Sequence, residues 1–469
     1  MRLVLAALLA LTVPAAAAAQ PSPVDQTRVE RTVAAEVVRD GDSWTVDYRF
    51  AEPSPAWLFP HGSVTVEGNR PWRPGSWMVE TPGVRIERRG RHDVLFAERG
   101  SVPEHVRIRF TPFSGDLVAE YDPALIFTDG SVALWSGHFH LLPVASAAAV
   151  AALPLDLTGI DFPGNGVEVK FRDAHGQVLH IGHRFDSATL IGGKVYVLFG
   201  PLQPIASAEV SAVIDPQLPE WLKRELSAST PSIFAAFARA LGPHNSPMPM
   251  LLASWQGPRA GLTSMGGSTL PGQIGMTFEG IGVVEESRDV RDSARWFIAH
   301  EGAHFWLGNT VHYEWTREAW ITEGGADLLA VRILSAIDPT YDPRPRLQEE
   351  VNYCASLAAQ PIEEAEERNE TRAFYACGAV FGLVAEAAAR RPFLAWIRDL
   401  IDANRSDQVL NRADWLGALD RDSRDPTLSR DIAVLLEHGG PDAKTMIASL
   451  FTRAGVRFTP GPDGVPRLQ

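Results

Sequence analysis

The feature that most constrains the fold of this chain is a pair of histidines, His300 and His304, in the apolar segment WFIAHEGAHFWLGNT (296–310). Residues four apart share one face of a helix, about 5 to 6 Å from each other, so the two imidazoles can hold one metal ion. Glu301 follows the first histidine, and the HExxH spacing places such a glutamate beside the water that the metal activates. The chain must therefore bury a helix next to a cavity.

A third candidate ligand follows the motif. Glu323 lies nineteen positions after His304, at the start of a second predicted helix. Two histidines and one carboxylate are the three-ligand set of a catalytic zinc site that keeps its fourth position open. A chance HExxH, the competing interpretation, does not account for this carboxylate. We therefore predict one Zn²⁺ per chain, bound by His300, His304 and Glu323, with Glu301 as general base.

The segment HEGAHFWLGNTVHYEWTREAWITEGGADLLA (300–330) resembles the gluzincin metallopeptidases, and most of all the aminopeptidase N family, peptidase family M1. That family's signature is HExxH, eighteen residues, and Glu within a W-x-x-E-G phrase. The stretches HFWLGN (304–309) and WITEG (320–324) correspond to its H-x-W-F-G-N and W-L-N-E-G. The resemblance implies a thermolysin-like catalytic domain that hydrolyses peptide bonds.

The resemblance also implies a group that stabilises the oxyanion. In the family this is a tyrosine in a Y-x-K-G phrase, and here Tyr375 opens Y-A-C-G, 52 positions after Glu323, with Cys377 in place of the lysine. A tyrosine that only packs in a helical core is the alternative. We predict that Tyr375 is the oxyanion donor.

Asp327 lies one helical turn after Glu323, so the two carboxylates share a face. A zinc-binding histidine normally donates its other ring nitrogen to an acceptor that fixes its tautomer. We predict this role for Asp327, an arrangement that resembles thermolysin more than aminopeptidase N. The alternative is an acid that is favoured near a helix N-terminus by the helix dipole.

One stretch departs from the resembled family. Its members carry G-x-M-E-N on the strand that edges the cleft, and the glutamate binds the free amino group of the substrate. Here residues 266–270 read GGSTL, with Thr269 at the glutamate position. Glu279 is the nearby acid that could substitute, although a strand-end carboxylate is the favoured interpretation. We therefore expect weak discrimination in favour of free N-termini.

The hydrophobic pattern divides the chain. Alternation with period two runs from about residue 25 to 205, and helical spacing dominates from about 218 onward. We predict a multi-domain α+β protein: a β-rich, antiparallel N-terminal domain (20–205), a thermolysin-like zinc catalytic domain (206–340) and a helical C-terminal part that completes the cleft (341–469). The last twelve residues are expected to fray.

The sequence also predicts the ends of the motif helix, the role of Gly302 and the role of a second histidine pair. Asp292 or Ser293 should cap the motif helix, and Gly308 should end it. Gly302, inside the motif, is either simply tolerated or keeps a side chain out of the cleft. His138 and His140 should share a strand face, as a structural pair rather than a second metal site.

The N-terminus resembles a secretory signal peptide. Arg2 precedes an apolar run, and small residues lead to a predicted cleavage site after Ala19, so residues 1–19 are set aside. The run is too short to span a membrane, and we predict a secreted or periplasmic protein without a membrane anchor. Cys354 and Cys377 can form a disulfide in that compartment or remain as buried thiols.

The formal net charge of −14, without a basic block, argues against nucleic acid as a partner. The predicted function is an exported zinc-dependent metallopeptidase acting on peptides or proteins, an aminopeptidase-like exopeptidase. The alternatives are a glycyl-aminopeptidase-like enzyme or an endopeptidase of the gluzincin type, and a scaffold protein without turnover. The intact set of His300, Glu301, His304 and Glu323 argues against the scaffold. The sequence does not give the oligomeric state or the side-chain preference.

Overall fold

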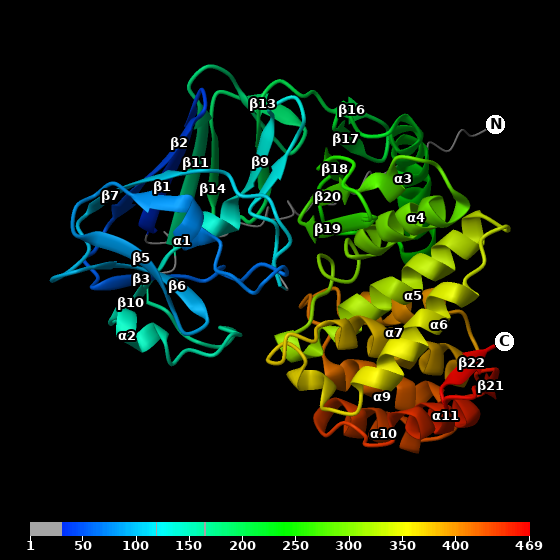
Figure 1. Cartoon of the computed structure of the whole chain (residues 1–469). Helices are drawn as coiled ribbons and strands as arrows, with labels where there is room; N and C mark the ends of the chain where they lie inside the picture. Colours follow the sequence, from blue (N-terminus) through cyan, green and yellow to red (C-terminus); the bar gives the residue numbers. More distant parts are fainter. Residues whose placement is uncertain (1–30, 119, 164–165) are drawn as a thin grey trace, which may run out of the picture.

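The structure, a computed structural model, describes residues 31–118, 120–163 and 166–469. The predicted signal peptide lies outside these residues. The N-terminal β-rich part, blue to green in Figure 1, consists mainly of strands, and the yellow to red C-terminal part consists mainly of helices. The predicted multi-domain α+β class is confirmed.

Three sheets build the N-terminal β-rich part. The six-stranded sheet has the order β14 (Ala188–Ile191), β11 (Gly166–Asp173), β1 (Arg31–Asp40), β2 (Ser43–Phe50), β7 (His105–Phe110) and β4 (Trp77–Val79). The four-stranded sheet has the order β10 (Leu142–Val144), β3 (Ala56–Phe59), β6 (His92–Ala97) and β5 (Val84–Arg89). The five-stranded sheet has the order β13 (His183–Phe185), β12 (Val178–His180), β15 (Tyr196–Phe199), β9 (Val132–Trp135) and β8 (Ala124–Ile126). Two short helices, α1 (Arg73–Ser76) and α2 (Ala147–Val150), accompany them.

Period-two alternation is the reason these segments form strands. In β2, every second residue from Trp44 to Phe50 is buried, so one face of the strand packs into the core. Strand β1 pairs antiparallel with β2 but parallel with β11, which departs from a purely antiparallel domain. A long stretch of chain separates β1 from β11, and such a crossover permits parallel pairing.

The middle part of the chain contains a mixed sheet and three long helices, of which the first lies between two strands of the sheet and the other two follow it. The strand order is β16 (Ile205–Ala206), β17 (Ser211–Ile214), β18 (Met250–Trp255), β20 (Gln273–Glu279) and β19 (Ser264–Leu270). The helices are α3 (Glu220–Leu241), α4 (Arg288–Ala303) and α5 (Trp320–Ile337). β19 is the edge strand, antiparallel to β20, and α4 runs beside it (Figure 1).

The C-terminal part is helical but ends in a hairpin. Its helices are α6 (Arg344–Leu357), α7 (Arg372–Ala389), α8 (Phe393–Ala403), α9 (Arg412–Asp422), α10 (Thr427–Glu437) and α11 (Ala443–Ala454). The expectation of a frayed tail is wrong, because β21 (Phe458–Pro460) pairs with β22 (Pro466–Leu468). Val465 is buried, and the Gln348 side chain accepts a hydrogen bond from the Leu468 backbone N–H at 2.8 Å.

A single hydrophobic core extends from Val210 to Val465 and unites the mixed sheet with the C-terminal helices. A second cluster, which includes Trp135 and Leu252, joins the β-rich part to the mixed sheet. The predicted domain boundaries at residues 205 and 340 stay predictions.

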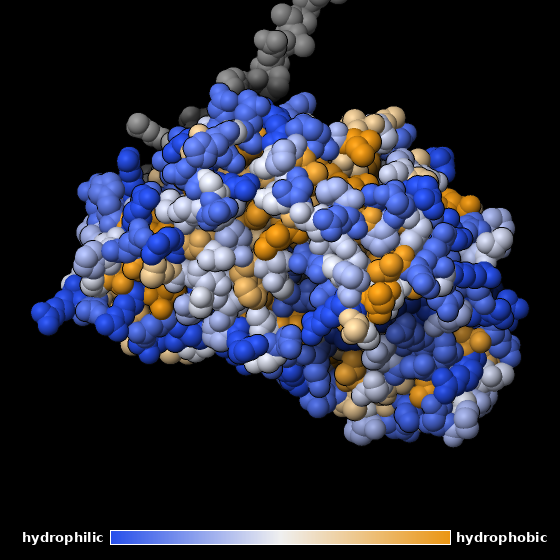
Figure 2. Space-filling view, turned by 45° about the horizontal axis from the view of Figure 1, so that its top comes forward, coloured by the Kyte–Doolittle hydropathy of each residue, from blue (hydrophilic) through white to orange (hydrophobic). Residues whose placement is uncertain are grey.

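Helix α7 is long and apolar enough to cross a membrane by length and composition, but 67% of it is buried inside the protein. Packing in the core therefore accounts for its apolar character. Figure 2 shows one face of the molecule, on which hydrophobic residues are scattered among hydrophilic ones.

Candidate metal centre

Helix α4 carries the HExxH motif and begins earlier than predicted. Ser287 caps it, since its side chain accepts a hydrogen bond from the Val290 N–H. The predicted caps Asp292 and Ser293 are wrong because they lie inside the helix, and the helix ends at Ala303, before Gly308. Ser287 and Val290 have the spacing of a serine cap and its N3 residue, a signal that the sequence offered.

Gly302 does not keep space open in the cleft. A Cβ at this position would lie 3.5 Å from the ring of Phe237 and 3.6 Å from that of Phe234, both on α3. These are ordinary packing distances, so Gly302 faces the core between α3 and α4. The interpretation in which it clears the cleft is wrong, and the glycine is tolerated at an ordinary packing position.

The structure brings the three predicted ligands together. The Nε2 atoms of His300 and His304 lie 3.1 Å apart, and Oε2 of Glu323 lies 3.6 Å and 3.3 Å from them. Tetrahedral zinc with bonds of 2.0 to 2.2 Å places its ligand atoms roughly 3.3 to 3.6 Å apart. Oε2 of Glu323 is buried and has no hydrogen-bond partner among the described residues. The three side chains therefore fit a zinc ion, and they form the group in the described chain that could hold a metal.

The electrostatics of the three ligands reflect their mutual contact. Burial by itself would lower the pKa of His300, but its interactions with Asp327 and Glu323 raise it to about 10. Burial would raise the pKa of Glu323, yet the adjacent imidazoles of His304 and His300 lower it. The pKa of Glu301 is raised, chiefly by burial. The site thus concentrates negative charge around two imidazoles, which favours a divalent cation.

Asp327 reaches the histidine that it was predicted to orient. Its Oδ1 lies 2.8 Å from Nδ1 of His300, whose Nε2 then faces the other ligands. His304 is oriented differently, because its Nδ1 lies 2.9 Å from the backbone oxygen of Leu307. Each imidazole is therefore held from behind by a different kind of acceptor, a carboxylate for one and a carbonyl for the other.

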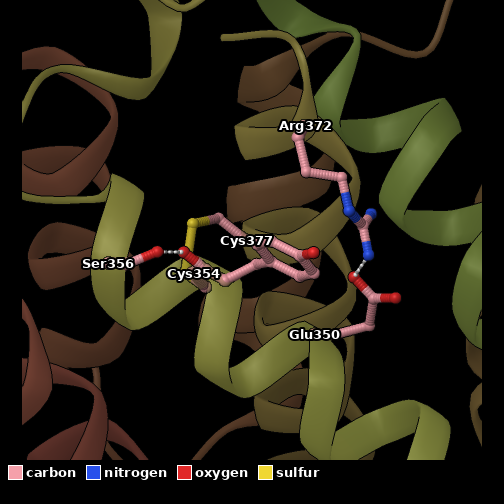
Figure 3. Close-up of a disulfide and its surroundings, with 6 residues drawn as sticks. Glu350, Cys354, Ser356, Arg372 and Cys377 are labelled. Carbon is pink, nitrogen blue, oxygen red and sulfur yellow. Dashed lines mark hydrogen bonds and ion pairs between the residues drawn. A yellow bond between two sulfur atoms is a disulfide. The ribbon is translucent and has the colours of Figure 1, made fainter.

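Behind Asp327 the contacts continue into the C-terminal helices. Nη1 of Arg372 lies 3.4 Å from Asp327, and Nη2 donates to Glu350 at 2.5 Å (Figure 3). Glu350 is buried, which together with the charge of Asp327 raises its pKa to about 7 despite the arginine.

The same two helices, α6 and α7, are joined covalently. Cys354 and Cys377 form a disulfide with the Cα atoms 4.7 Å apart, close to the Arg372–Glu350 pair (Figure 3). The alternative of buried free thiols is wrong.

A cavity of about 640 Å³ opens onto the three ligands. Its walls come from the β-rich part, the edge strand β19, the motif helix, α5 and the start of α7. Tyr375 lines it and stacks on the His300 ring, with the ring centroids 5.7 Å apart. Its hydroxyl interacts with Glu323, and the nearby negative charge of Glu323, together with burial, raises the pKa of Tyr375. The predicted oxyanion donor therefore lies beside the predicted ligands.

Two carboxylates in the cavity were missed by sequence reasoning. Glu120 comes from the β-rich part and Glu366 from the segment before α7, and both also line an adjoining cavity of about 490 Å³. Oε2 of Glu120 lies 3.0 Å from Nδ1 of His61, which fixes its position. Burial and neighbouring acids raise the pKa of Glu366 to about 7. No local motif marks either residue.

Glu279 does not take the place of the missing family glutamate. It pairs with Ser264 at one end of the β19–β20 hairpin, whereas Thr269 pairs with Ile274 near the other end. Thr269 lines the cavity, and its hydroxyl lies 2.7 Å from the backbone oxygen of Glu301 and 2.9 Å from Oε2. The departure from the family pattern thus places a hydroxyl directly on the predicted general base.

His138 and His140 are buried in the β-rich part, away from the cavity. The expectation that they share a strand face is wrong, because His138 lies in a 3-10 turn (Ser136–Phe139) and His140 follows it. Among the residues that the structure describes, they belong to no group of side chains spaced to hold a metal. The structural role is the interpretation that remains.

Comparisons with known proteins agree with the motif. Residues 281–378 match the family model described as the peptidase family M1 domain. A search of curated proteins finds no significant match. The resemblance to family M1 is therefore confirmed on the segment that carries the predicted ligands and Tyr375.

Solved structures match nearly the whole chain. An aminopeptidase N family protein from Idiomarina loihiensis has a TM-score of 0.60 at 12% identity, over 87% of this chain and 76% of that one. Legionella pneumophila aminopeptidase A, in complex with aspartic acid, has a TM-score of 0.52 at 12% identity, over 88% and 49%. Yeast LTA4 hydrolase has a TM-score of 0.51 at 12% identity, over 88% and 68%. At these identities the likeness concerns the fold.

Proposed function

We propose, from the premise that the catalytic segment is a peptidase family M1 domain, that this protein is an exported zinc-dependent metallopeptidase with one zinc ion per chain. One observation carries the proposal. The possible ligand atoms of His300, His304 and Glu323 lie within 4.8 Å of one another. Glu301 and Tyr375 line the same cavity. A scaffold protein would have no need for this complete set.

The side chains divide the chemistry. Zinc, when bound, acidifies a water molecule and polarises the scissile carbonyl. Glu301 takes a proton from the attacking water and returns it to the leaving amine, and its raised pKa suits an acid–base group. Tyr375 donates its hydroxyl to the oxygen that becomes negative in the transition state.

Aminopeptidase-like action needs an anchor for the substrate's ammonium group. Thr269 carries no charge, and Glu120 is the cavity carboxylate that is already held in place, by His61. We assign the anchor to Glu120. A charge-assisted contact contributes about 1.5 to 3 kcal/mol, or roughly tenfold to a hundredfold in preference for a free amine.

The second candidate function is endopeptidase action. The adjoining cavity of about 490 Å³ continues past Glu120 and Glu366, which leaves room for substrate residues beyond the anchored amine. We therefore expect N-acetylated peptides to lose less than about a hundredfold in kcat/KM relative to free peptides.

The test is cleavage of matched free and N-acetylated peptides by the zinc-replete protein. Glu301→Gln should retain zinc and lose about 10² to 10⁴ in kcat. Glu120→Gln should reduce the preference for free amines about tenfold, whereas Glu279→Gln, a carboxylate outside the cavity, should not change it. No cleavage of any peptide by zinc-replete protein refutes the function. A preference for free amines above about a thousandfold refutes the weak anchor.

Export has its own test. The mature protein should be recovered from the medium or the periplasm with Gln20 as its first residue. Recovery of the unprocessed chain from the cytoplasm alone contradicts the proposal.

A further inference from the structure

We propose that Thr269 is a positioning residue for Glu301, whose carboxylate it holds in place through a hydrogen bond from its hydroxyl. The inference rests on the proposed function, in which Glu301 is the general base. Thr269 stands where the resembled family has its amine-binding glutamate, so the inference gives this position a different role.

The geometry offers Thr269 two acceptors on one residue. Its Oγ1 lies 2.7 Å from the backbone oxygen of Glu301 and 2.9 Å from Oε2 of the same residue. A hydroxyl carries one proton, so it donates to one of the two at a time. Since both lie within hydrogen-bond range, rotation of the O–H bond alone exchanges them, without movement of a heavier atom.

The carbonyl of Glu301 is accessible because the motif helix ends there. The last four carbonyls of a helix lack partners within it. The N–H of Phe305, which would donate to Glu301 in a continuing helix, donates instead to Gly302 at 3.2 Å. Thr269 therefore meets a carbonyl at a helix end and a carboxylate together.

The edge strand is fixed at the distance that this contact needs. The Tyr121 hydroxyl donates to the backbone oxygen of Thr269 at 3.3 Å, and the Asn309 side chain donates to that of Leu270 at 3.3 Å. A Cβ at Gly267 would lie 2.7 Å from the Phe297 ring on α4, so a larger residue there would push β19 away. Contacts from the β-rich part and from the motif helix thus hold Thr269 against Glu301.

The contact fixes which carboxylate oxygen of Glu301 is available for the reaction. The Thr269 hydroxyl donates to Oε2, and a hydrogen bond to a carboxylate is stronger than one to a neutral acceptor. Oε1 is then left free to take a proton from water.

Three variants separate this role from simple helix capping. Thr269→Val removes the hydroxyl at nearly constant shape, and Thr269→Ser retains it. Thr310→Val is the matched control, because the Thr310 hydroxyl donates to the Phe305 carbonyl at 2.8 Å, near the same helix end. Should Thr269→Val fail to fold, Thr269→Ala serves in its place.

Thr269→Val should lose about tenfold to a hundredfold in kcat, the effect of a hydrogen bond to a charged group, with KM and zinc content unchanged. Thr269→Ser should restore kcat, and Thr310→Val should lower the melting temperature while it keeps kcat. A second readout needs no turnover: the affinity of the zinc-loaded protein for acetohydroxamate, measured by calorimetry, should fall about tenfold in Thr269→Val and recover in Thr269→Ser.

Unchanged kcat and hydroxamate affinity in Thr269→Val would make Thr269 a helix cap and overturn the proposal. A serine variant that fails to recover overturns it as well, since the hydroxyl is then not the cause. If the wild type cleaves no peptide while the hydroxamate affinities follow the expected pattern, the positioning role stands and the proposed function fails.

Discussion

His300 and His304 lie among carboxylates, whereas His138 lies between two tryptophan rings and His140 is buried two residues further on. Nδ1 of His300 is 2.8 Å from Asp327, and Glu323 faces both motif histidines. The His138 ring lies between Trp72 and Trp135, with centroid distances of 4.9 and 4.5 Å. Neither ring nitrogen of His138 has a hydrogen-bond partner among the described residues.

The two environments shift the pKa values in opposite directions. The acidic partners of His300 raise its pKa to about 10 against the effect of burial. Burial lowers the pKa of His138, aided by the charge of Arg73, and lowers that of His140 to about 3. Burial alone therefore does not make a histidine a ligand, because a ligand also needs an acceptor behind it and an anionic neighbour in front.

The largest effect is expected when a histidine of the motif pair is replaced. His300→Ala or His304→Ala should reduce zinc from about one ion per chain to near zero and abolish peptide cleavage, because two ligands hold zinc far more weakly than three. His138→Gln and His140→Gln should retain a full complement of zinc. Metal analysis of protein purified without chelator measures both. Zinc that survives loss of His304 but not of His138 reverses the assignment.

The aromatic neighbours give a second contrast, since Tyr375 lines the cavity with its hydroxyl beside Glu323, whereas the indole N–H of Trp135 is buried without a partner among the described residues. Tyr375→Phe should lower kcat by about 10² or more with little change in KM, because the missing hydroxyl acts only on the transition state. Tyr353→Phe, on the neighbouring helix and 42% exposed, is the matched control. Normal turnover in Tyr375→Phe would reduce Tyr375 to a packing residue.

Asp327→Asn sharpens the comparison, because it makes the surroundings of His300 more like those of His138. The neutral amide retains the shape but loses the charge that orients the imidazole, so zinc affinity should fall about 10- to 100-fold. Competition with a chromophoric chelator gives the dissociation constant. Identical values for variant and wild type would restrict Asp327 to a role in packing.

The smallest expected effect concerns stability in acid. Since the folded pKa values of His138 and His140 are lowered, the unfolded chain takes up protons that the folded protein refuses once the pH falls below about 6.5. Each histidine should then lower the free energy of unfolding by about 2 kcal/mol at pH 5. Denaturant unfolding at pH 7 and 5 should show a smaller loss for His140→Gln than for the wild type. An equal loss in both proteins contradicts the neutral, buried state.

His300 should behave in the opposite way in chelated protein. Its folded pKa is raised to about 10, so its stabilising contribution is complete below about pH 6.5 and is lost as the pH rises through 10. The sign of the pH dependence therefore distinguishes the two pairs.

The sequence indicates those parts of the site that follow from the geometry of one helix. His300 with His304, and Glu323 with Asp327, are four apart, and helix periodicity alone places each pair on one face. The Ser287 cap was missed although a local signal was present, because two later polar residues looked equally suitable. The role of Glu120 could not be predicted from the sequence, since its place in the cavity depends on how the β-rich part packs against the mixed sheet.

Contacts between separate elements account for the other differences. Thr269 reaches Glu301 because β19 lies against α4, and neither segment encodes that distance. Cys354 and Cys377 pair because α6 and α7 lie side by side. The terminal hairpin forms because Val465 and Leu468 contact the helical part. These contacts order a segment whose glycine and proline content suggested fraying.

The disulfide has a consequence for substrate binding that goes beyond holding two helices together. The loop that it closes, from Cys354 to Cys377, contains Glu366 and Tyr375, and these residues form one wall of the cavity. Closure of a loop of this length removes about 3 kcal/mol of chain entropy from the unfolded state. Under the proposed function, an arriving peptide then meets a wall that the disulfide already holds in place, instead of having to immobilise that wall at each turnover.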